Sequence, residues 1–200
     1  MTRRVGVLGG TFDPIHYAHL AIAEEARLTF GLDRVFFVPA AHQPLKAGVH
    51  GASPTDRLAM TRHAIADNPA FEVSPLEIER SGPSYTAVTL EQLSREVSGE
   101  LFFILGLDVL VDLPRWHAAE RVVEYAQLIG VGRPGATFDA MALFQALPGL
   151  RGRLHLIDGP GMALASSTIR RRIAAGLSIR YLTPDAVVAY IEERQLYRES

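Results

Sequence analysis

The chain has 200 residues, of which 48% are hydrophobic and 21% are charged, and this ordinary composition excludes a disordered chain. It contains no cysteine, which excludes a disulfide scaffold, a thiolate zinc site and a cysteine nucleophile. The formal net charge of −2 gives no overall field that would draw the chain to nucleic acid or to a membrane, so any anion site must be local. We expect one domain over residues 1–200, with residues 165–200 as a C-terminal helical subregion.

No targeting or membrane segment is expected. The apolar run at 5–8, close to the start of the chain, is too short for the core of a signal peptide. No uncharged apolar run approaches the roughly 20 residues of a membrane helix. These patterns predict a cytoplasmic protein without a membrane partner.

Short apolar runs alternate with helical patterns along the chain. Strands are predicted at 5–8, 34–38, 71–73, 101–105, 128–131 and 154–157. Helices are predicted at 18–30, 57–67, 86–97, 138–146, 167–175 and 185–195, the second with Ser53 as its N-cap and the last started by residues 183–185. This alternation predicts an α/β fold with a doubly wound parallel sheet and a small C-terminal helical part. In such folds the ligand crevice lies beyond the carboxyl ends of the strands, near the switch in strand order.

The first predicted strand leads directly into a glycine-containing loop and a helix. Gly9 and Gly10 would let the backbone approach a ligand and adopt a positive φ, and the helix start would favour an anion. His16 and His19 lie three positions apart, so both would face one side of the first helical turn. Each could donate to a phosphate oxygen and become a cation beside it. A plain tight turn with surface histidines, or a metal-binding pair, would also fit these residues.

Residues 9–19 read GGTFDPIHYAH, which resembles the signature of the HxGH nucleotidyltransferase superfamily and, within it, of the nicotinate-nucleotide adenylyltransferases. The chain departs from that signature at Ala18, where the family usually has glycine. The resemblance implies a Rossmann-like fold and an enzyme of pyridine nucleotide and NAD biosynthesis. It implies that ATP and nicotinate mononucleotide are the substrates, that deamido-NAD and pyrophosphate are the products, and that Gly9, Gly10, Thr11 and Phe12 bind ATP.

Five later segments resemble motifs of the same family in the same order. They are 42–46 (HQPLK), 81–86 (SGPSYT), 105–108 with 113–116 (LGLD and LPRW), 131–135 (VGRPG) and 164–170 (LASSTIR). The resemblance implies that Lys46 and Arg170 hold the polyphosphate, supported by Ser166 and Ser167. It places Gly106, Asp108 and Arg133 near the adenosine, and Tyr85, Thr86 and Trp116 around the nicotinate mononucleotide.

Each of these residues also has a purely structural interpretation. Lys46, Arg133 and Arg170 could be solvated surface charges, Asp108 could be a helix N-cap, and Trp116 could belong to the core. Ser84 or Thr86 is expected to cap the helix that follows.

The expected reaction transfers an adenylyl group, with His16, His19, Lys46 and Arg170 as the catalytic residues. Mg²⁺ is expected to arrive as a chelate of ATP, without a metal site on the protein. The alternatives are transfer to the amide mononucleotide or to phosphopantetheine, cytidylyl transfer, a nucleotide-binding regulator without turnover, and a nucleic-acid-binding module. No nucleic acid partner is expected, and the sequence leaves a homo-oligomer open.

Overall fold

A computed structural model describes residues 2–41, 51–133, 135 and 138–198 of the chain. Its centre is a six-stranded sheet in the order β3-β2-β1-β4-β5-β6, and every neighbouring pair of strands is parallel. The strands are β1 (Arg4–Gly10), β2 (Arg34–Pro39), β3 (Phe71–Val73), β4 (Glu100–Gly106), β5 (Gln127–Gly132) and β6 (Leu154–Asp158). All six strands were predicted from the apolar runs of the sequence.

The central strands are apolar on both faces. In β4, Phe103 and Leu105 pack into one core, while Phe102 and Ile104 pack into the other. This explains why the sequence of β4 is a continuous apolar run, since a parallel sheet covered by helices on both sides leaves no strand face in water.

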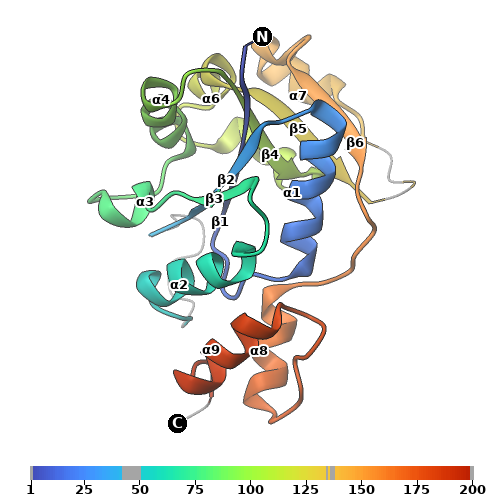
Figure 1. The fold of residues 1–200 in the computed structure, drawn as a ribbon. Coiled ribbons are helices and arrows are strands. Elements are labelled where there is room, and N and C mark those ends of the chain that lie inside the picture. Colours follow the sequence, from blue (N-terminus) through green and yellow to red (C-terminus); the bar gives the residue numbers. More distant parts are fainter. Residues whose placement is uncertain (1, 42–50, 134, 136–137, 199–200) are drawn as a thin grey trace.

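Helices cover both faces of the sheet (Figure 1). The longer ones are α1 (Tyr17–Phe30), α2 (Pro54–Ile65), α4 (Thr86–Glu96), α6 (Ala119–Tyr125), α7 (Met141–Ala146), α8 (Ser166–Ala174) and α9 (Asp185–Glu193). Short turns of helix form α3 (Leu76–Glu79), α5 (Leu107–Leu110), η2 (Leu113–Arg115) and η3 (Pro148–Leu150). Buried residues of α1, α2, α8 and α9 share one core, and those of α4, α6 and α7 share the other. The predicted doubly wound architecture is therefore confirmed.

The chain changes direction across the sheet at β1. Its neighbours are β2 on one side and β4 on the other, so the connections that leave the carboxyl ends of β1 and β4 diverge. This is the switch point at which doubly wound folds place their ligand crevice. Gly10 ends β1 and Gly106 ends β4, so both of these predicted site residues lie at that point.

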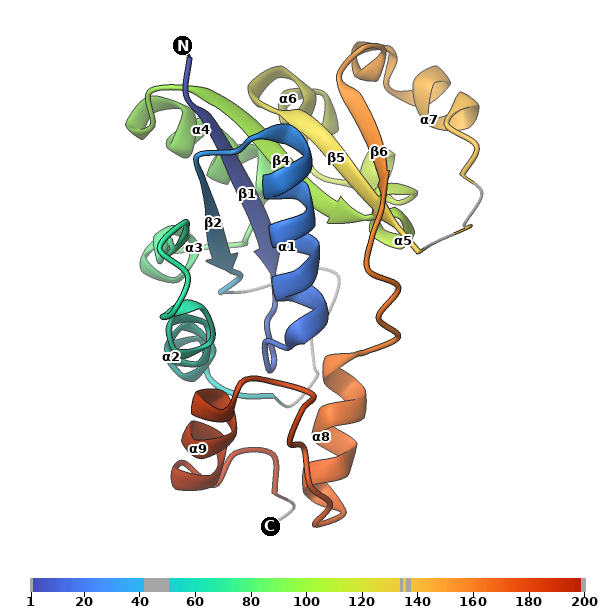
Figure 2. The ribbon, with the colours of Figure 1, turned by 45° about the vertical axis from the view of Figure 1, so that its right-hand side comes forward.

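The C-terminal helices α8 and α9 lie below the carboxyl ends of the strands (Figure 2). Ile169 of α8 and Val187, Val188 and Ile191 of α9 belong to the same buried core as Phe37 of β2. The packing therefore joins the C-terminal part to the sheet at the edge where the crevice is expected.

Local hydrogen bonds set the helix boundaries. Ser53 caps α2 as predicted, because its hydroxyl accepts the Asp56 N–H at 3.1 Å. The helix predicted at 138–146 begins at Met141, because the Asp139 carboxylate accepts the Met141 N–H at 2.8 Å and forms a turn ahead of the helix. The last helix ends at Glu193, two residues before the predicted end, and Gln195 has a φ of 52° that a right-handed helix cannot continue.

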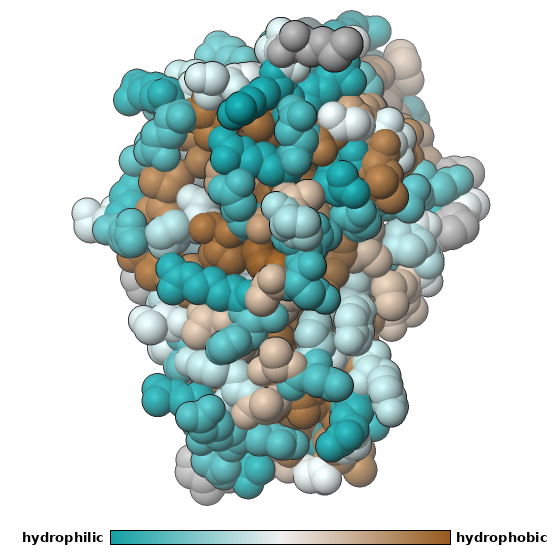
Figure 3. Space-filling model, in the orientation of Figure 1, coloured by the Kyte–Doolittle hydropathy of each residue, from teal (hydrophilic) through white to brown (hydrophobic). Residues whose placement is uncertain are grey.

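Figure 3 shows the hydropathy of the face seen in Figure 1, with apolar residues in patches over its middle and upper parts, among hydrophilic ones, and mostly hydrophilic residues in its lower part. Within the described part of the chain, no helix combines the length and the apolar character needed to cross a membrane.

Candidate active site

The first loop, residues 9–16, connects β1 to α1 at the switch point and has a constrained backbone. Phe12 adopts a left-handed conformation with φ of 51°, and its side chain is only 2% exposed. A Cβ on Gly10 would lie 2.6 Å from the Phe12 ring, so glycine is needed there for the ring to turn inward. The prediction of a positive φ at Gly9 or Gly10 was wrong, because Phe12 takes that conformation instead.

The backbone carbonyls of this loop accept hydrogen bonds from side chains far away in the sequence. Arg57 Nη1 donates to Thr11 O (2.7 Å), Arg170 Nη1 to Asp13 O (2.7 Å), Ser166 Oγ to Pro14 O (2.9 Å) and Thr183 Oγ1 to Ile15 O (2.7 Å). These donors come from α2 and from the C-terminal part of the chain. They fix the orientation of successive peptide groups, and with it the path of the loop.

His16 is the N-cap residue of α1 and is buried, with 4% of its surface exposed. Its ring stacks on that of His19, with centroids 3.7 Å apart. Burial lowers the pKa of His16 from 6.5 to about 4, because the charged form would lose its hydration. His16 is therefore neutral at pH 7 in this structure.

His19 lies in the first turn of α1, beside the ring edge of Phe12 at 5.1 Å between centroids. Its Nδ1 accepts the His16 N–H at 3.3 Å. A neutral His19 that accepts at Nδ1 carries its proton on Nε2. The loop thus fixes both the position and the tautomer of this imidazole.

The first turns of α1 and α8 meet at the first loop (Figure 2). Ser166 is the first residue of α8 and bonds Pro14, only three residues before α1 begins. The starts of α1 and α8 therefore lie near one place, and the positive ends of the two helix dipoles favour an anion there. Ser167 is exposed at this turn, and Arg170 follows with 24% of its side chain exposed.

Two of the residues predicted to bind phosphate also hold the loop. The Ser166 hydroxyl and one nitrogen of the Arg170 guanidinium bond loop carbonyls, and Arg170 Nη1 also lies 3.6 Å from Asp13 Oδ2. A guanidinium carries five N–H donors, so Arg170 can hold the loop and still donate to a phosphate.

At the ends of β4 and β5 the structure places three predicted adenosine residues. A Cβ on Gly106 would lie 2.5 Å from Asp108 Oδ1, so glycine leaves room for this carboxylate. Asp108 is exposed within α5, whose N-cap is Gly106, and the interpretation of Asp108 as an N-cap was wrong. Arg133 is exposed directly after β5.

The residues predicted for the mononucleotide form an aromatic group on the other side of the switch point. Tyr85 stacks on His117 with centroids 4.1 Å apart, and Trp116 packs edge-on against Phe103 of β4 at 6.1 Å. Trp116 is half-buried, so it belongs partly to the core and still exposes part of its ring. Thr86, also half-buried, begins α4.

The predicted serine or threonine cap of α4 was wrong. Its N-cap is Tyr85, with no side-chain capping bond. The Ser84 hydroxyl instead accepts the Ala41 N–H at 3.0 Å, which ties this segment to the end of β2. Lys46 and the rest of residues 42–50 lie outside the described residues.

Sequence reasoning missed several residues of the site. His117 could have been suspected from its position beside Trp116. Arg57 and Tyr197 belong to no recognisable motif. Arg57 is only 5% exposed and also donates to Ala41 O and Ala52 O. The Tyr197 hydroxyl donates to the Asp13 carboxylate. Within the described residues, no group of three or more His, Asp or Glu side chains could hold a metal ion.

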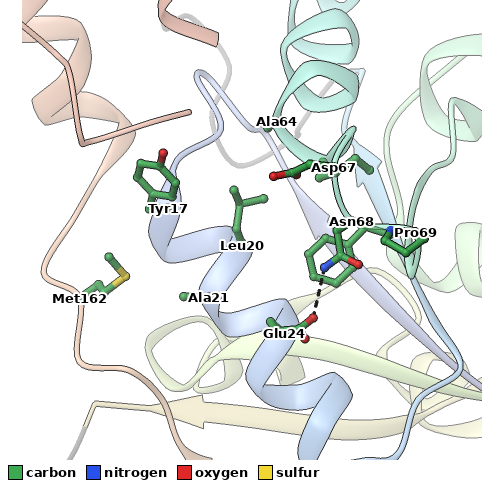
Figure 4. A pocket seen from close by; sticks show the side chains of 11 residues that line it. Tyr17, Leu20, Ala21, Glu24, Ala64, Asp67, Asn68, Pro69 and Met162 are labelled. Atoms are coloured by element: carbon green, nitrogen blue, oxygen red, sulfur yellow. Dashed lines mark hydrogen bonds between the residues drawn. The ribbon is translucent and has the colours of Figure 1, made fainter. Parts of the chain in front are cut away.

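A separate groove of about 490 Å³ runs along α1 (Figure 4). It lies between Tyr17, Leu20 and Glu24 of α1, the turn at Asn68 that precedes β3, and Met162, which lies between β6 and α8. Asn68 Nδ2 donates to Glu24 at 3.3 Å across it. The described residues that line this groove include none of those predicted to bind a substrate.

Comparison with known proteins identifies the family of the chain. Residues 7–173 match the cytidylyltransferase-like family. A probable nicotinate-nucleotide adenylyltransferase from Roseiflexus sp. (strain RS-1) is 56% identical over 97% of this chain and 98% of its own length. One from Herpetosiphon aurantiacus is 53% identical over 98% of each chain. The chain belongs to the nicotinate-nucleotide adenylyltransferase family.

Solved structures of nicotinic acid mononucleotide adenylyltransferase from Plasmodium falciparum share the fold of this adenylyltransferase. The complex with NaAD superposes with a TM-score of 0.78 and the complex with APC with 0.76, each covering 98% of this chain and 97% of the other, at 20% identity. The family assigned from the motifs, the Rossmann-like fold and the nucleotidyltransferase class are thus confirmed.

Proposed function

We propose that this adenylyltransferase transfers the adenylyl group of ATP to the 5′-phosphate of nicotinate mononucleotide and releases pyrophosphate. A phosphate oxygen of the mononucleotide bonds to the α-phosphorus of ATP, and the bond from that phosphorus to the bridging oxygen of the pyrophosphate breaks. The observation that carries the proposal is the meeting of the first loop, the start of α1 and the start of α8 at the switch point of the sheet.

The first loop and the starts of α1 and α8 form the phosphate side of the crevice, and this side supplies positioned donors. His19 carries its proton on Nε2 and stands in the first turn of α1, from which it donates to the α-phosphate. Arg170 and Ser167 at the start of α8 bind the β- and γ-phosphates and then the leaving pyrophosphate, and Lys46 assists them. His16 stays neutral and fixes the His19 ring through its N–H and by stacking.

No general base is needed, because the attacking phosphate is already an anion. The barrier comes from bringing two polyanions together in line. Alignment of bound reactants supplies on the order of 7 kcal/mol. Fixed donors lower the cost of the charge that develops on the transferring group. Mg²⁺ enters as a chelate of the ATP phosphates.

The remaining predicted residues divide between the two nucleosides. Asp108 accepts hydrogen bonds from the ribose of ATP, with Gly9, Gly10, Thr11, Phe12, Gly106 and Arg133 beside the same nucleotide. Trp116 and Tyr85 offer ring faces to the electron-poor pyridine, and Thr86 at the start of α4 lies near its carboxylate. We propose a cytoplasmic location, where both substrates would be at hand.

The test is pyrophosphate release from ATP and Mg²⁺ with each mononucleotide in turn. We expect release with nicotinate mononucleotide and a lower kcat/KM with the amide. Faster turnover of the amide would reassign the substrate. ATP binding without release with either mononucleotide would identify a nucleotide-binding regulator and contradict the proposal.

A further inference from the structure

Asp13 is the centre of a buried polar cluster directly behind the first loop. Its carboxylate belongs to a residue that is 7% exposed. Oδ1 accepts two hydrogen bonds, from the Ala52 N–H at 2.9 Å and from the Tyr197 hydroxyl at 2.7 Å. Oδ2 faces Arg170 Nη1 at 3.6 Å. A buried carboxylate needs several partners, and here one of them comes from 184 positions along the chain.

Two partners compete for the N–H groups of Arg170, namely Asp13 and the phosphates of ATP. Arg170 bonds the Asp13 carbonyl at 2.7 Å and lies near the Asp13 carboxylate, and the proposed function needs its other N–H groups for the phosphates of ATP. A carboxylate short of hydrogen bonds would attract the guanidinium into a close bidentate pair. Such a pair would turn the donors of Arg170 inward, away from the phosphates.

Tyr197 bears on that competition. Its short bond to Oδ1, together with the Ala52 N–H, satisfies one carboxylate oxygen and leaves Arg170 at a distance from the other. Burial, with the nearby Asp13 carboxylate, raises the pKa of the Tyr197 hydroxyl well above its ordinary value, so the hydroxyl keeps its proton and remains a donor.

We propose that Tyr197 is a positioning residue for ATP, which acts through Asp13 to keep the guanidinium of Arg170 directed toward the phosphates. The inference rests on the proposed function, because it assigns Arg170 to the polyphosphate. It predicts that the loss of one hydroxyl near the end of the chain weakens the binding of ATP and leaves the mononucleotide side unchanged.

The chain offers a matched control. Tyr190 of α9 also donates its hydroxyl to a carboxylate, at 2.9 Å from Asp56 Oδ1. Asp56 lies in the first turn of α2 and does not belong to the cluster around Asp13. Tyr190→Phe and Tyr197→Phe therefore remove the same chemical group from the same part of the fold, but only one removal acts on Asp13.

The experiment measures binding of ATP and of pyrophosphate by calorimetry, and KM for both substrates, in the full-length protein. We expect Tyr197→Phe to weaken binding of both ligands about tenfold, the scale of a lost hydrogen bond to a charged group, with KM for nicotinate mononucleotide unchanged. Tyr190→Phe should bind both ligands like the parent protein. Equal ATP binding by the two variants would overturn the proposal.

A double-mutant cycle tests the route through Asp13. In Asp13→Asn the charge that competes for Arg170 is gone, so adding Tyr197→Phe should change ATP binding less than twofold. If Tyr197→Phe weakens ATP binding as much in the Asn background as in the parent, the effect does not pass through Asp13 and the proposal fails. The parent protein's turnover with nicotinate mononucleotide is measured separately, so failure of the proposed function would be recognised independently.

Discussion

On the phosphate side of the crevice, side-chain hydrogen bonds from α2 and from the C-terminal part of the chain hold the first loop, whereas on the other side ring contacts hold Tyr85, Trp116 and His117. The difference follows from the chemistry that each side would serve. Donors aimed at developing charge act only when their directions are fixed beforehand. A planar substrate ring needs a flat surface of matching shape to stack on, and packing alone can hold such a surface in place. The phosphate side should therefore respond most strongly to the loss of single polar atoms.

The strongest expected effect is at His19. His19→Ala should raise the barrier for turnover by about 2–4 kcal/mol, because one preorganised donor to the α-phosphate is lost. The measurement is kcat for pyrophosphate release. His63→Ala is the control, since His63 is an exposed histidine of α2 that packs beside Tyr190. Parent-like kcat in His19→Ala would remove this side chain from the mechanism.

Acid should destabilise the phosphate side through His16. Its pKa is about 4 in the folded chain, against 6.5 for a fully hydrated histidine, so the unfolded chain binds more protons between these values. The free energy of unfolding then falls as the pH drops from 6.5 to 4, by about 3 kcal/mol for this group. Denaturant titrations at several pH values give the dependence of the free energy of unfolding on pH. In His16→Gln the contribution of this histidine to that dependence should be lost. An identical slope in both proteins would contradict the burial of a neutral imidazole.

The loop carbonyls can be tested through Thr183. Thr183→Val keeps the shape but removes the donor to Ile15 O, so it should lower the free energy of unfolding by about 1–3 kcal/mol. Thr61→Val is a close control, because Thr61 is equally buried and donates at the same 2.7 Å to Arg57 O. That carbonyl lies inside α2, whose backbone ladder still supplies a donor, so the cost there should be smaller. Equal losses of unfolding free energy in the two variants would mean that the hydrogen bond from Thr183 stabilises the loop no more than the one from Thr61 stabilises α2.

On the aromatic side, Trp116→Ala should act on one substrate. The loss of a stacking face should raise KM for nicotinate mononucleotide by roughly tenfold, about 1.4 kcal/mol, with little change in KM for ATP. Steady-state kinetics with each substrate varied in turn decide the matter. A change confined to ATP would reverse the division of the crevice between the two nucleotides.

The sequence predicts the sheet well because each central strand is a continuous apolar run. Local patterns predicted α1, α2, α4, α7, α8 and α9, whereas α6 (Ala119–Tyr125) was not predicted. The strands 101–105 and 128–131 could be placed without knowledge of their neighbours. The doubly wound arrangement follows from the alternation alone. Helix ends were less exact where a side chain such as Asp139 forms a turn that the apolar pattern does not contain.

The site was only partly predictable. Motif residues such as His19 and Trp116 are visible because their types and spacing are distinctive. Arg57 and Tyr197 are not, because a hydrogen bond from one side chain to a distant carbonyl or carboxylate leaves no local pattern. The conformation of Phe12 was missed for a related reason. A positive φ was expected at the preceding glycines, which tolerate it, but the buried ring of Phe12 requires the left-handed backbone at its own position.

The bond between Tyr197 and Asp13 also bears on how the protein is made. Asp13 leaves the ribosome before the hydroxyl that completes its cluster, which emerges 184 residues later. During synthesis the sheet could assemble around a loop whose catalytic geometry is still unfinished. A nascent chain cut short before Tyr197 would then resemble the mature protein in its core and still be a poor enzyme.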